Sequence, residues 1–348
     1  MNRLARSLLE CLVIGGLACV VLAAHPVGGA SAMAAMAGSS RPVGGIALPA
    51  AQNQTGQRIY QFVRQWSEPR PFNGENPAFG GITVDTSGHV YVIDQDAYIN
   101  KYTDAGTLLS RWKAQSIPNG ALDTPVGLAV DRDGNILVTD SFDDRVVKLD
   151  PNGNYLGQWR DPGPWNSQFH LTTDVAADQS GNSYVTEIYD DRVQKFDPNG
   201  NLITEWGTQG RGNGQFDNPG GIGVGQNGDV YVVDEHNYRV EVFTSSGGYL
   251  GQWGTQGTGD GQFGLPGTLA IDNAGNVVVA DAGNDRIEVF DQNGNYLTQW
   301  GNPSQFEGPS GVATDPRGNV YVADGTGRVQ VFAPIIFTST IFLPVVGR

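Results

Sequence analysis

Short runs of apolar residues recur along the chain, and apolar and polar positions alternate within each run. The clearest copy covers residues 267–300 and contains four such runs, at 269–271, 277–280, 287–290 and 296–300. Alternation over a few residues is typical of half-buried β-strands, and the Asp, Asn and Gly residues between the runs are typical of tight turns. Each copy of the pattern therefore predicts four short strands.

The copies repeat with a nearly constant period. A tryptophan ends each fourth run, and successive tryptophans are 46, 47, 47, 47 and 47 residues apart; they are Trp66, Trp112, Trp159, Trp206, Trp253 and Trp300. Trp165 alone is out of phase. First strands are expected at 82–85, 128–131, 175–178, 222–225, 269–272 and 312–315. Such a period, with one supersecondary unit in each copy, is typical of repeat architectures.

The array is offset by one strand. The sixth copy ends after residues 329–332 without a fourth strand, whereas residues 60–66 match a fourth strand and precede the first complete copy. We expect the N-terminal segment to pair with the last three strands, so that the array closes into a ring without an open edge. A linear solenoid is the rival architecture, but it needs polar capping copies and does not explain the offset.

The repeated motifs resemble a known family. The copies have a Pro-x-Gly lead, a Val-Tyr-Val-x-Asp strand and an Asn-x-Arg-Val-x-Val-Phe strand, and the chain resembles secreted bacterial NHL-repeat proteins over about residues 58–333. The resemblance implies an all-β fold: a six-bladed β-propeller of four-stranded blades, in which the N-terminal strand completes the last blade. Blade three departs from the pattern, since Thr172-Thr-Asp174 replaces Pro-x-Gly.

The composition agrees with a single turn-rich β domain. Glycine supplies 49 of 348 residues, about 14% against a usual ~7%, and charged residues supply 16% against ~25%. These values exclude a coiled coil or a helical bundle. The length alone would allow two ordinary domains, but six copies of about 47 residues place about 282 residues in one domain.

The N-terminus has the order of a secretory signal. Arg3 and Arg6 precede an apolar run at 12–24, and small residues follow around 30–32. We therefore predict a protein that is secreted or presented at the cell surface; retention of the leader as a membrane anchor is the alternative. The predicted parts are a signal peptide at 1–32, a flexible lead-in at 33–57, the propeller at 58–333 and a C-terminal tail at 334–348.

The mature chain is acidic and contains no cysteine, because Cys11 and Cys19 both lie in the leader. Disulfides, zinc-thiolate sites and cysteine nucleophiles are thereby excluded. The formal net charge of −15 at pH 7 becomes −16 without residues 1–32, which carry two basic residues and one acidic residue. Nucleic acid and anionic lipid require a surface of the opposite sign. We expect no nucleic acid partner, no membrane contact beyond the leader, and a monomer.

Two kinds of connection meet at one end of the predicted blades. Inner links join the second and third strands, lead loops join the fourth strand to the next blade, and in an antiparallel blade both emerge at the same end. The lead loops are long, about thirteen residues at 207–219 and 254–266, whereas the other end carries tight Asp-x-x-Gly turns. This long-loop face is therefore the expected functional surface.

Each inner link opens with an acidic residue and closes with arginine in five blades, while Tyr98 replaces the arginine in blade one. Recurrence in phase predicts a structural role, in which the acid and the arginine bond to backbone groups or to each other. The structural positions are Asp140, Arg145, Glu187, Arg192, Asp234, Arg239, Asp281, Arg286, Asp324 and Arg328.

Residues that differ between blades are the candidates for ligand binding. Acidic and aromatic residues gather in the inner links of blades two to four, and the lead loop of blade three adds a tryptophan and a histidine. The candidates are Phe142, Asp143, Asp144, Trp165, His170, Tyr189, Asp190, Asp191, Glu235, His236 and Tyr238. Such a rim suits a basic peptide, a cation or a sugar stacked on tyrosine. A solvated rim without a ligand is the alternative.

No set of residues in the sequence predicts catalysis. Peptidyl-hydroxyglycine lyases have a comparable propeller whose zinc is held by histidines from several blades, but His89, His170 and His236 occupy different positions of the repeat. We predict no catalytic residue, no metal site and no cofactor. The predicted function is a non-enzymatic extracellular binding or scaffold module that recognises a protein, a basic peptide or a glycan on the long-loop face.

The alternative function is a metal-dependent lyase or hydrolase of the peptidyl-hydroxyglycine lyase or related propeller type. In this alternative, acidic residues at the ends of the first strands hold calcium near the channel; they are Asp85, Asp131, Asp178, Asp272 and Asp315. Their recurrence in five of six copies also fits a simple role in turn formation.

Overall fold

The computed structural model describes residues 59–67, 81–94, 96–160, 169 and 171–335. Residues 1–57 form a separate unit from residues 58–348, and only the second unit is described below. The predicted signal peptide and lead-in, and most of the predicted tail, lie outside the described residues and stay predictions. Within the described part of the chain, no helix is long and apolar enough to cross a membrane.

The described residues form twenty-four strands in six antiparallel sheets of four strands each, the blades of a propeller. From the innermost strand outward, blade one contains β2 (Ile82–Val84), β3 (Val90–Ile93), β4 (Tyr98–Tyr102) and β5 (Leu108–Lys113). Blade two contains β6 (Pro125–Val130), β7 (Ile136–Asp140), β8 (Arg145–Leu149) and β9 (Tyr155–Trp159). Blade three contains β10 (Thr172–Ala177), β11 (Ser183–Glu187), β12 (Arg192–Phe196) and β13 (Leu202–Trp206).

Blade four contains β14 (Pro219–Val224), β15 (Val230–Asp234), β16 (Arg239–Phe243) and β17 (Tyr249–Trp253). Blade five contains β18 (Pro266–Ile271), β19 (Val277–Asp281), β20 (Arg286–Phe290) and β21 (Tyr296–Trp300). Blade six contains β22 (Pro309–Thr314), β23 (Val320–Asp324), β24 (Arg328–Pro334) and β1 (Tyr60–Ser67). Short 3-10 helices η1 (Ala114–Ser116), η2 (Glu235–Asn237) and η3 (Ala282–Asn284) lie in connections.

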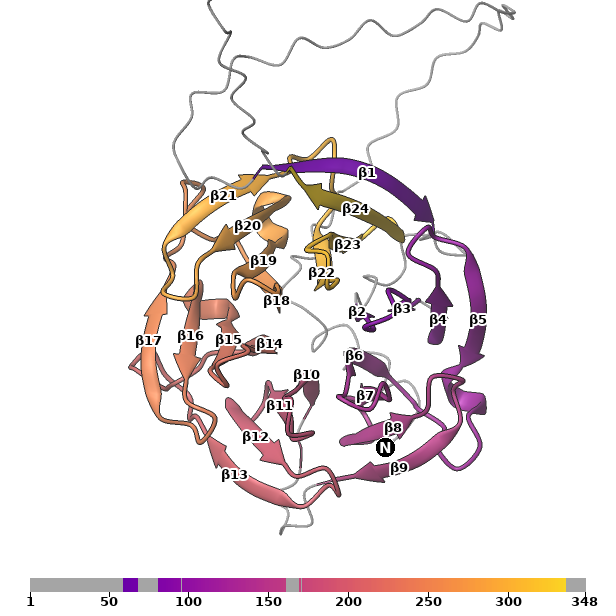
Figure 1. Cartoon of the computed structure of the whole chain (residues 1–348). Helices are drawn as coiled ribbons and strands as arrows, with labels where there is room; N and C mark the ends of the chain where they lie inside the picture. The colour runs from indigo at the N-terminus through magenta and orange to yellow at the C-terminus, as the bar shows by residue number, and fades with distance from the viewer. Residues whose placement is uncertain (1–58, 68–80, 95, 161–168, 170, 336–348) are drawn as a thin grey trace, which may run out of the picture. The chain divides into compact units, whose positions relative to one another are not determined.

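The blades surround one axis, and the ring is closed by the N-terminal strand (Figure 1). Strand β1 pairs antiparallel with β24, from Tyr60 opposite Pro334 to Ser67 opposite Arg328. The prediction of a six-bladed propeller closed in this way is confirmed, and a linear solenoid is excluded. Because β24 has a partner, no blade presents its third strand as an open edge.

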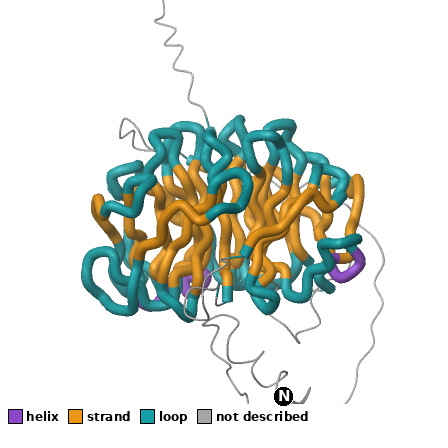
Figure 2. Tube along the Cα trace, turned by 90° about the horizontal axis from the view of Figure 1, so that it is seen from below, coloured by secondary structure: helices purple, strands orange, loops and turns teal. Residues whose placement is uncertain are grey.

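The strands run between two loop-covered faces, and the short helical turns lie at one of them (Figure 2). The lead loops and the inner links meet at this long-loop face, where Arg239 at the end of the link in blade four donates to the carbonyl oxygens of Gly212 and Gln215 in the lead loop. The predicted arrangement of the two kinds of connection is thus present in the structure.

The first strands begin earlier than predicted in several blades. Strand β6 starts at Pro125, three residues before the predicted Leu128, and its pairing with β7 shifts register between these two residues. A β-bulge adds a residue without a partner, so the apolar and polar positions stop alternating at that point. The alternation therefore identified only the part of the strand beyond the bulge.

The hydrophobic core lies between adjacent blades, and the repeated tryptophans form its outer edge. Gly153 in the last turn of blade two has a φ of +84° and packs against Trp112 of blade one, where an added Cβ would lie 2.5 Å from the indole. The same contact joins Gly200 to Trp159 in the next pair of blades. The spacing of tryptophan and glycine in the sequence therefore reflects a contact between successive blades.

The contact at ring closure takes another form. In blade six, β24 and β1 come from opposite ends of the sequence and are not joined by a turn. No glycine turn therefore covers the last tryptophan there. Instead the ring of Tyr60 on β1 stacks on Trp300, with 4.5 Å between the ring centroids. The N-terminal strand therefore supplies both a backbone ladder and the missing cover of the core.

Candidate functional site

The acid and the arginine of each inner link tie the link to the lead loop before it. In blade four, Arg239 Nε donates to Asp234 Oδ2 at 2.7 Å, and the other oxygen of Asp234 accepts the backbone N–H of Asp217 at 2.8 Å. Asp234 is fully buried, and this burial raises the pKa of its carboxyl even though Arg239 lies beside it. The pair therefore holds the long-loop face together.

Equivalent acid and arginine pairs occur in the other blades. The ion pairs are Asp140 with Arg145, Glu187 with Arg192, Asp281 with Arg286 and Asp324 with Arg328. In blade one the acid Asp94 pairs with Arg111 of β5, because the third strand there begins with Tyr98. The acid is therefore paired with an arginine in all six described links.

In each link, the residue just before the closing arginine, or before Tyr98 in blade one, has a left-handed backbone conformation. In three blades this residue is an aspartate that binds the next lead loop. Asp144 Oδ1 accepts the backbone N–H of Leu171 at 3.0 Å, and Asp191 Oδ1 accepts that of Asn218 at 3.0 Å. Asp285 accepts the N–H of Gly308 in the same way. Two predicted ligand-binding residues, Asp144 and Asp191, thus bind backbone groups of the following blade.

Other candidate residues are also engaged within the fold. Asp143 pairs with Arg145 at 3.0 Å and Asp190 pairs with Arg192 at 3.3 Å. Glu235 is buried and accepts the side-chain N–H of Asn218 at 2.6 Å. Phe142 and Tyr238 are half-buried, and Tyr238 packs against the core between blades four and five. Trp165 and His170 lie outside the described residues.

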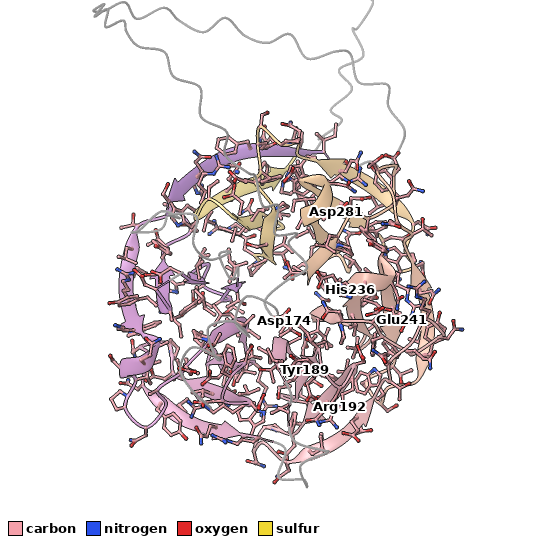
Figure 3. The ribbon with its side chains drawn as sticks, turned by 180° about the vertical axis from the view of Figure 1, so that it is seen from behind. Asp174, Tyr189, Arg192, His236, Glu241 and Asp281 are labelled. Carbon is pink, nitrogen blue, oxygen red and sulfur yellow. The ribbon has the colours of Figure 1, made fainter. Side chains whose placement is uncertain are left out.

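Tyr189 and His236 are the candidates that remain exposed in this part of the face. Tyr189 is 56% exposed, and the side chain of His236 is 46% exposed with its Nδ1 3.2 Å from Asp217 Oδ1. Both lie on the side of blades three and four that faces the axis (Figure 3). We call Tyr189, Asp190, Asp217 and His236 the junction site.

The two links of the junction site are joined through one side chain. The backbone N–H of Asn218 binds Asp191 in blade three, and its side-chain amide binds Glu235 in blade four. Burial raises the pKa of Asp191, and the neighbouring carboxylates of Asp217, Asp234 and Asp190 raise it further. Several carboxylates therefore lie close together at the junction site, and two of those around Asp191 are paired with arginines, Asp190 with Arg192 and Asp234 with Arg239.

Asp174 on β10 is a functional candidate that the sequence analysis did not select. It occupies a position where most blades have glycine, and its carboxylate accepts the backbone N–H groups of Val175 at 2.9 Å and of Ile222 in blade four at 3.1 Å. Burial raises the pKa of Asp174 to about 7. The side chain is half-buried near the axis of the ring (Figure 3). Its signal in the sequence was the replacement of Pro-x-Gly by Thr172-Thr-Asp174.

The acids at the ends of the first strands serve their own turns. Asp131 accepts the backbone N–H groups of Asp133 and Asn135, both at 2.9 Å, and pairs with Lys148 at 2.7 Å. The equivalent aspartates accept the same pair of backbone N–H groups; they are Asp85, Asp178, Asp272 and Asp315. Across the described ranges, no group of three or more His, Cys, Asp or Glu side chains is arranged to hold a metal ion.

The fold and these contacts define the class of the protein, a six-bladed β-propeller of four-stranded blades. The family model described as NHL repeat matches residues 216–243 in blade four and 306–332 in blade six. These two segments therefore match the NHL repeat that the motifs predicted. No curated protein matches the sequence at a significant level.

Solved structures share the fold at low sequence identity. A streptogramin B lyase has a TM-score of 0.55 at 15% identity, over 78% of this chain and 98% of that chain. Virginiamycin B lyase from Staphylococcus aureus has a TM-score of 0.52 at 12% identity, over 80% of this chain and 100% of that chain. A gluconolactonase from Xanthomonas campestris has a TM-score of 0.55 at 13% identity, with the same coverage. These similarities show the propeller fold alone.

Proposed function

We propose that the protein is a secreted or surface-presented recognition module that binds a basic peptide segment at the junction site. The observation that carries the proposal is the exposed ring of Tyr189, which precedes Asp190 and Asp191 in the link of blade three, where the carboxylate of Asp217 from the following lead loop also acts on Asp191. An Arg or Lys side chain can lie over a tyrosine ring while its charge faces a carboxylate, and an exposed cation–π contact contributes about 0.5–1 kcal/mol. The rigid tie through Asn218 keeps both links in place for such a ligand.

The charge of the protein supports the same class of partner. The net charge of −15 and the acids of the junction site attract cationic segments over long range, which raises the association rate and makes binding sensitive to salt. A basic peptide is therefore expected to bind more weakly as ionic strength increases. A sugar stacked on Tyr189 would lack this salt dependence, which separates the two kinds of ligand.

The test uses the full chain and a fluorescein-labelled nine-residue peptide rich in arginine and lysine. Fluorescence anisotropy is expected to show saturable binding at low salt and no binding of a peptide in which glutamine replaces the basic residues. Tyr189→Ala is expected to weaken binding about fivefold, the equivalent of about 1 kcal/mol. Leu156→Ala, at a residue that is 52% exposed on the outer strand β9, is the matched control and should bind normally. Equal affinities for Tyr189→Ala and the unaltered chain would refute the junction site.

A lyase or hydrolase is the second candidate function, and Asp174 is the observation that favours it. A half-buried carboxyl with a pKa of about 7 near the axis has the property expected of a general acid or base. The solved propellers reported above as lyases and as a gluconolactonase have the same fold. A three-histidine zinc site does not fit the described residues, because His89 lies in a turn at one end of the strands and His236 in a link at the other. Metal analysis of the purified chain tests the metal-dependent form of this candidate.

A further inference from the structure

Blade one differs from the other blades at two positions of the repeat. The third strand begins with arginine in blades two to six, but with Tyr98 in blade one. The residue before the outer tryptophan is Arg111 in blade one; in the other blades it is Gln158, Glu205, Gln252, Gln299 and Gln65. The arginine that pairs with the link acid therefore comes from β5 instead of β4.

In this position Arg111 keeps the ion pair and gains a stacked contact. Its Nη2 donates to Asp94 Oδ2 at 2.6 Å, and its Cζ lies 3.6 Å from the centroid of the Tyr98 ring. Tyr98 is directly opposite Lys113 in the ladder of β4 and β5, and Lys113 Nζ lies 5.9 Å from the same centroid. Two cationic side chains thus gather around one tyrosine on one side of the blade.

These residues line a cavity that is open to solvent. Asp96, Tyr98, Arg111 and Lys113 line a volume of about 260 Å³ at the end of blade one that belongs to the long-loop face. This volume lies close to the lower end of the ~300–1,000 Å³ that small-molecule pockets occupy. The lining is polar, so the cavity suits a small polar molecule.

The guanidinium of Arg111 has hydrogen-bonding capacity left. The equivalent Arg239 of blade four donates to Asp234 and to lead-loop carbonyl oxygens. Arg111 donates to Asp94 alone among the described residues, and its Nε is buried without a hydrogen-bond partner. Arg111 and Lys113 both line the cavity, so their N–H groups are the donors that it offers to an anionic ligand.

The charges around the cavity restrict the ligand. Arg111 and Lys113 carry two positive charges, and Asp94 and Asp96 carry two negative charges. A dianion such as phosphate would meet this balanced set with an excess of negative charge. A monoanion with an adjacent hydroxyl adds only one negative charge to the balanced set, and its hydroxyl can donate to a carboxylate oxygen while its carboxylate faces the cations.

We infer that the cavity of blade one binds a small hydroxy acid of monosaccharide size, with its carboxylate at Lys113 and Arg111 and a neighbouring hydroxyl donating to Asp96. The ring of Tyr98 fixes the guanidinium plane, so that Arg111 is already oriented before the ligand arrives. This site lies in blade one and is separate from the junction site of blades three and four, so either site can fail its test without the other.

The test titrates the full chain with D-glucuronate, D-glucose and inorganic phosphate by isothermal titration calorimetry. Saturable binding is expected for glucuronate, and much weaker binding for glucose and for phosphate. Lys113→Gln is expected to weaken glucuronate binding about tenfold, because it removes one charge-assisted hydrogen bond. This variant should fold, since Lys113 is exposed and forms no ion pair in the described structure.

Arg132→Gln is the matched control, because it makes the same change of net charge at a side chain that is 51% exposed in a turn of blade two. It should bind glucuronate normally. The inference is overturned if glucuronate does not bind, if glucose or phosphate binds as well as glucuronate, or if Lys113→Gln and Arg132→Gln have the same affinity.

Discussion

Burial raises the pKa of two acidic residues on the third strands even though each lies beside an arginine. Glu241 and Glu288 on the third strands of blades four and five are fully buried, and burial raises the pKa of each to about 7 although an arginine lies beside it. The reason is that Arg239 and Arg286 each also pair with the acid of the link. One cation therefore serves two carboxylates in each of these blades.

Asp174 provides a prediction at the same scale, because no arginine or lysine is paired with it in the described structure. Its folded-state pKa of about 7 lies above the usual value of 3.8, so the folded protein binds this proton more tightly than the unfolded chain. The associated stability is complete below about pH 4 and is lost as the pH rises through 7. At pH 8 we expect Asp174→Asn to raise the free energy of unfolding by on the order of 2 kcal/mol, and at pH 5 much less.

Chemical denaturation at the two pH values measures this effect. Asp133→Asn is the control, since it removes the same charge from a side chain that is 64% exposed, and it should change stability little at either pH. If Asp174→Asn changes the free energy of unfolding by the same amount at pH 5 and at pH 8, the pKa of Asp174 is not raised in the folded protein.

At the scale of the elements, the turns are specified by the backbone conformation they require and by what lies against them. Gly134 in the first turn of blade two has a φ of +82°, and nothing lies within 4 Å of an added Cβ. Gly153 in the last turn of the same blade has a similar φ of +84°, but its added Cβ would meet the Trp112 indole. A side chain at Gly134 would therefore cause backbone strain alone, whereas a side chain at Gly153 would cause the same strain and also a steric clash.

The paired substitutions Gly134→Ala and Gly153→Ala test this distinction. Gly134→Ala should lower the free energy of unfolding by about 1 kcal/mol, the strain of a left-handed alanine. Gly153→Ala should lower it by about 3 kcal/mol, because the indole must also move in a packed interface. Urea unfolding of both variants measures the difference. Equal losses would mean that the contact between Trp112 and the turn adds nothing to stability.

For the propeller as a whole, stability depends on closure of the ring. Strand β1 pairs with the edge of β24, and Tyr60 on β1 covers Trp300. The first described strand therefore completes both the sheet of blade six and the core between blades five and six. A chain without residues 1–67 would leave β24 as an unpaired edge, which is prone to pair with other chains. A chain without residues 1–57 keeps β1.

We expect the chain lacking residues 1–67 to unfold at a lower temperature and to associate into larger species. The chain lacking residues 1–57 is the control and should stay as stable and as monomeric as the full chain. Thermal unfolding and size-exclusion chromatography with light scattering provide the measurements. A monomeric chain 68–348 with unchanged thermal stability would show that the closing strand is dispensable.

The repeat allowed the sequence to predict the fold because each blade carries the same local signals. The alternating runs, the glycines of the turns and the fourth strand missing after residue 332 together indicated six blades and a closing strand at 60–66. The early starts of the first strands were missed, since a bulge such as that between Pro125 and Leu128 interrupts the alternation.

The candidate sites depended on contacts that a sequence does not display. Asp144 and Asp191 bind backbone groups 27 residues away, and Asp174 binds one 48 residues away in the next blade. Sequence alone determined the type and period of the elements, because strands and turns follow from local residue patterns. Only the tertiary structure decided which acids are used within the fold, which are exposed and how Arg111 stacks on Tyr98, because these properties arise where blades, links and lead loops meet.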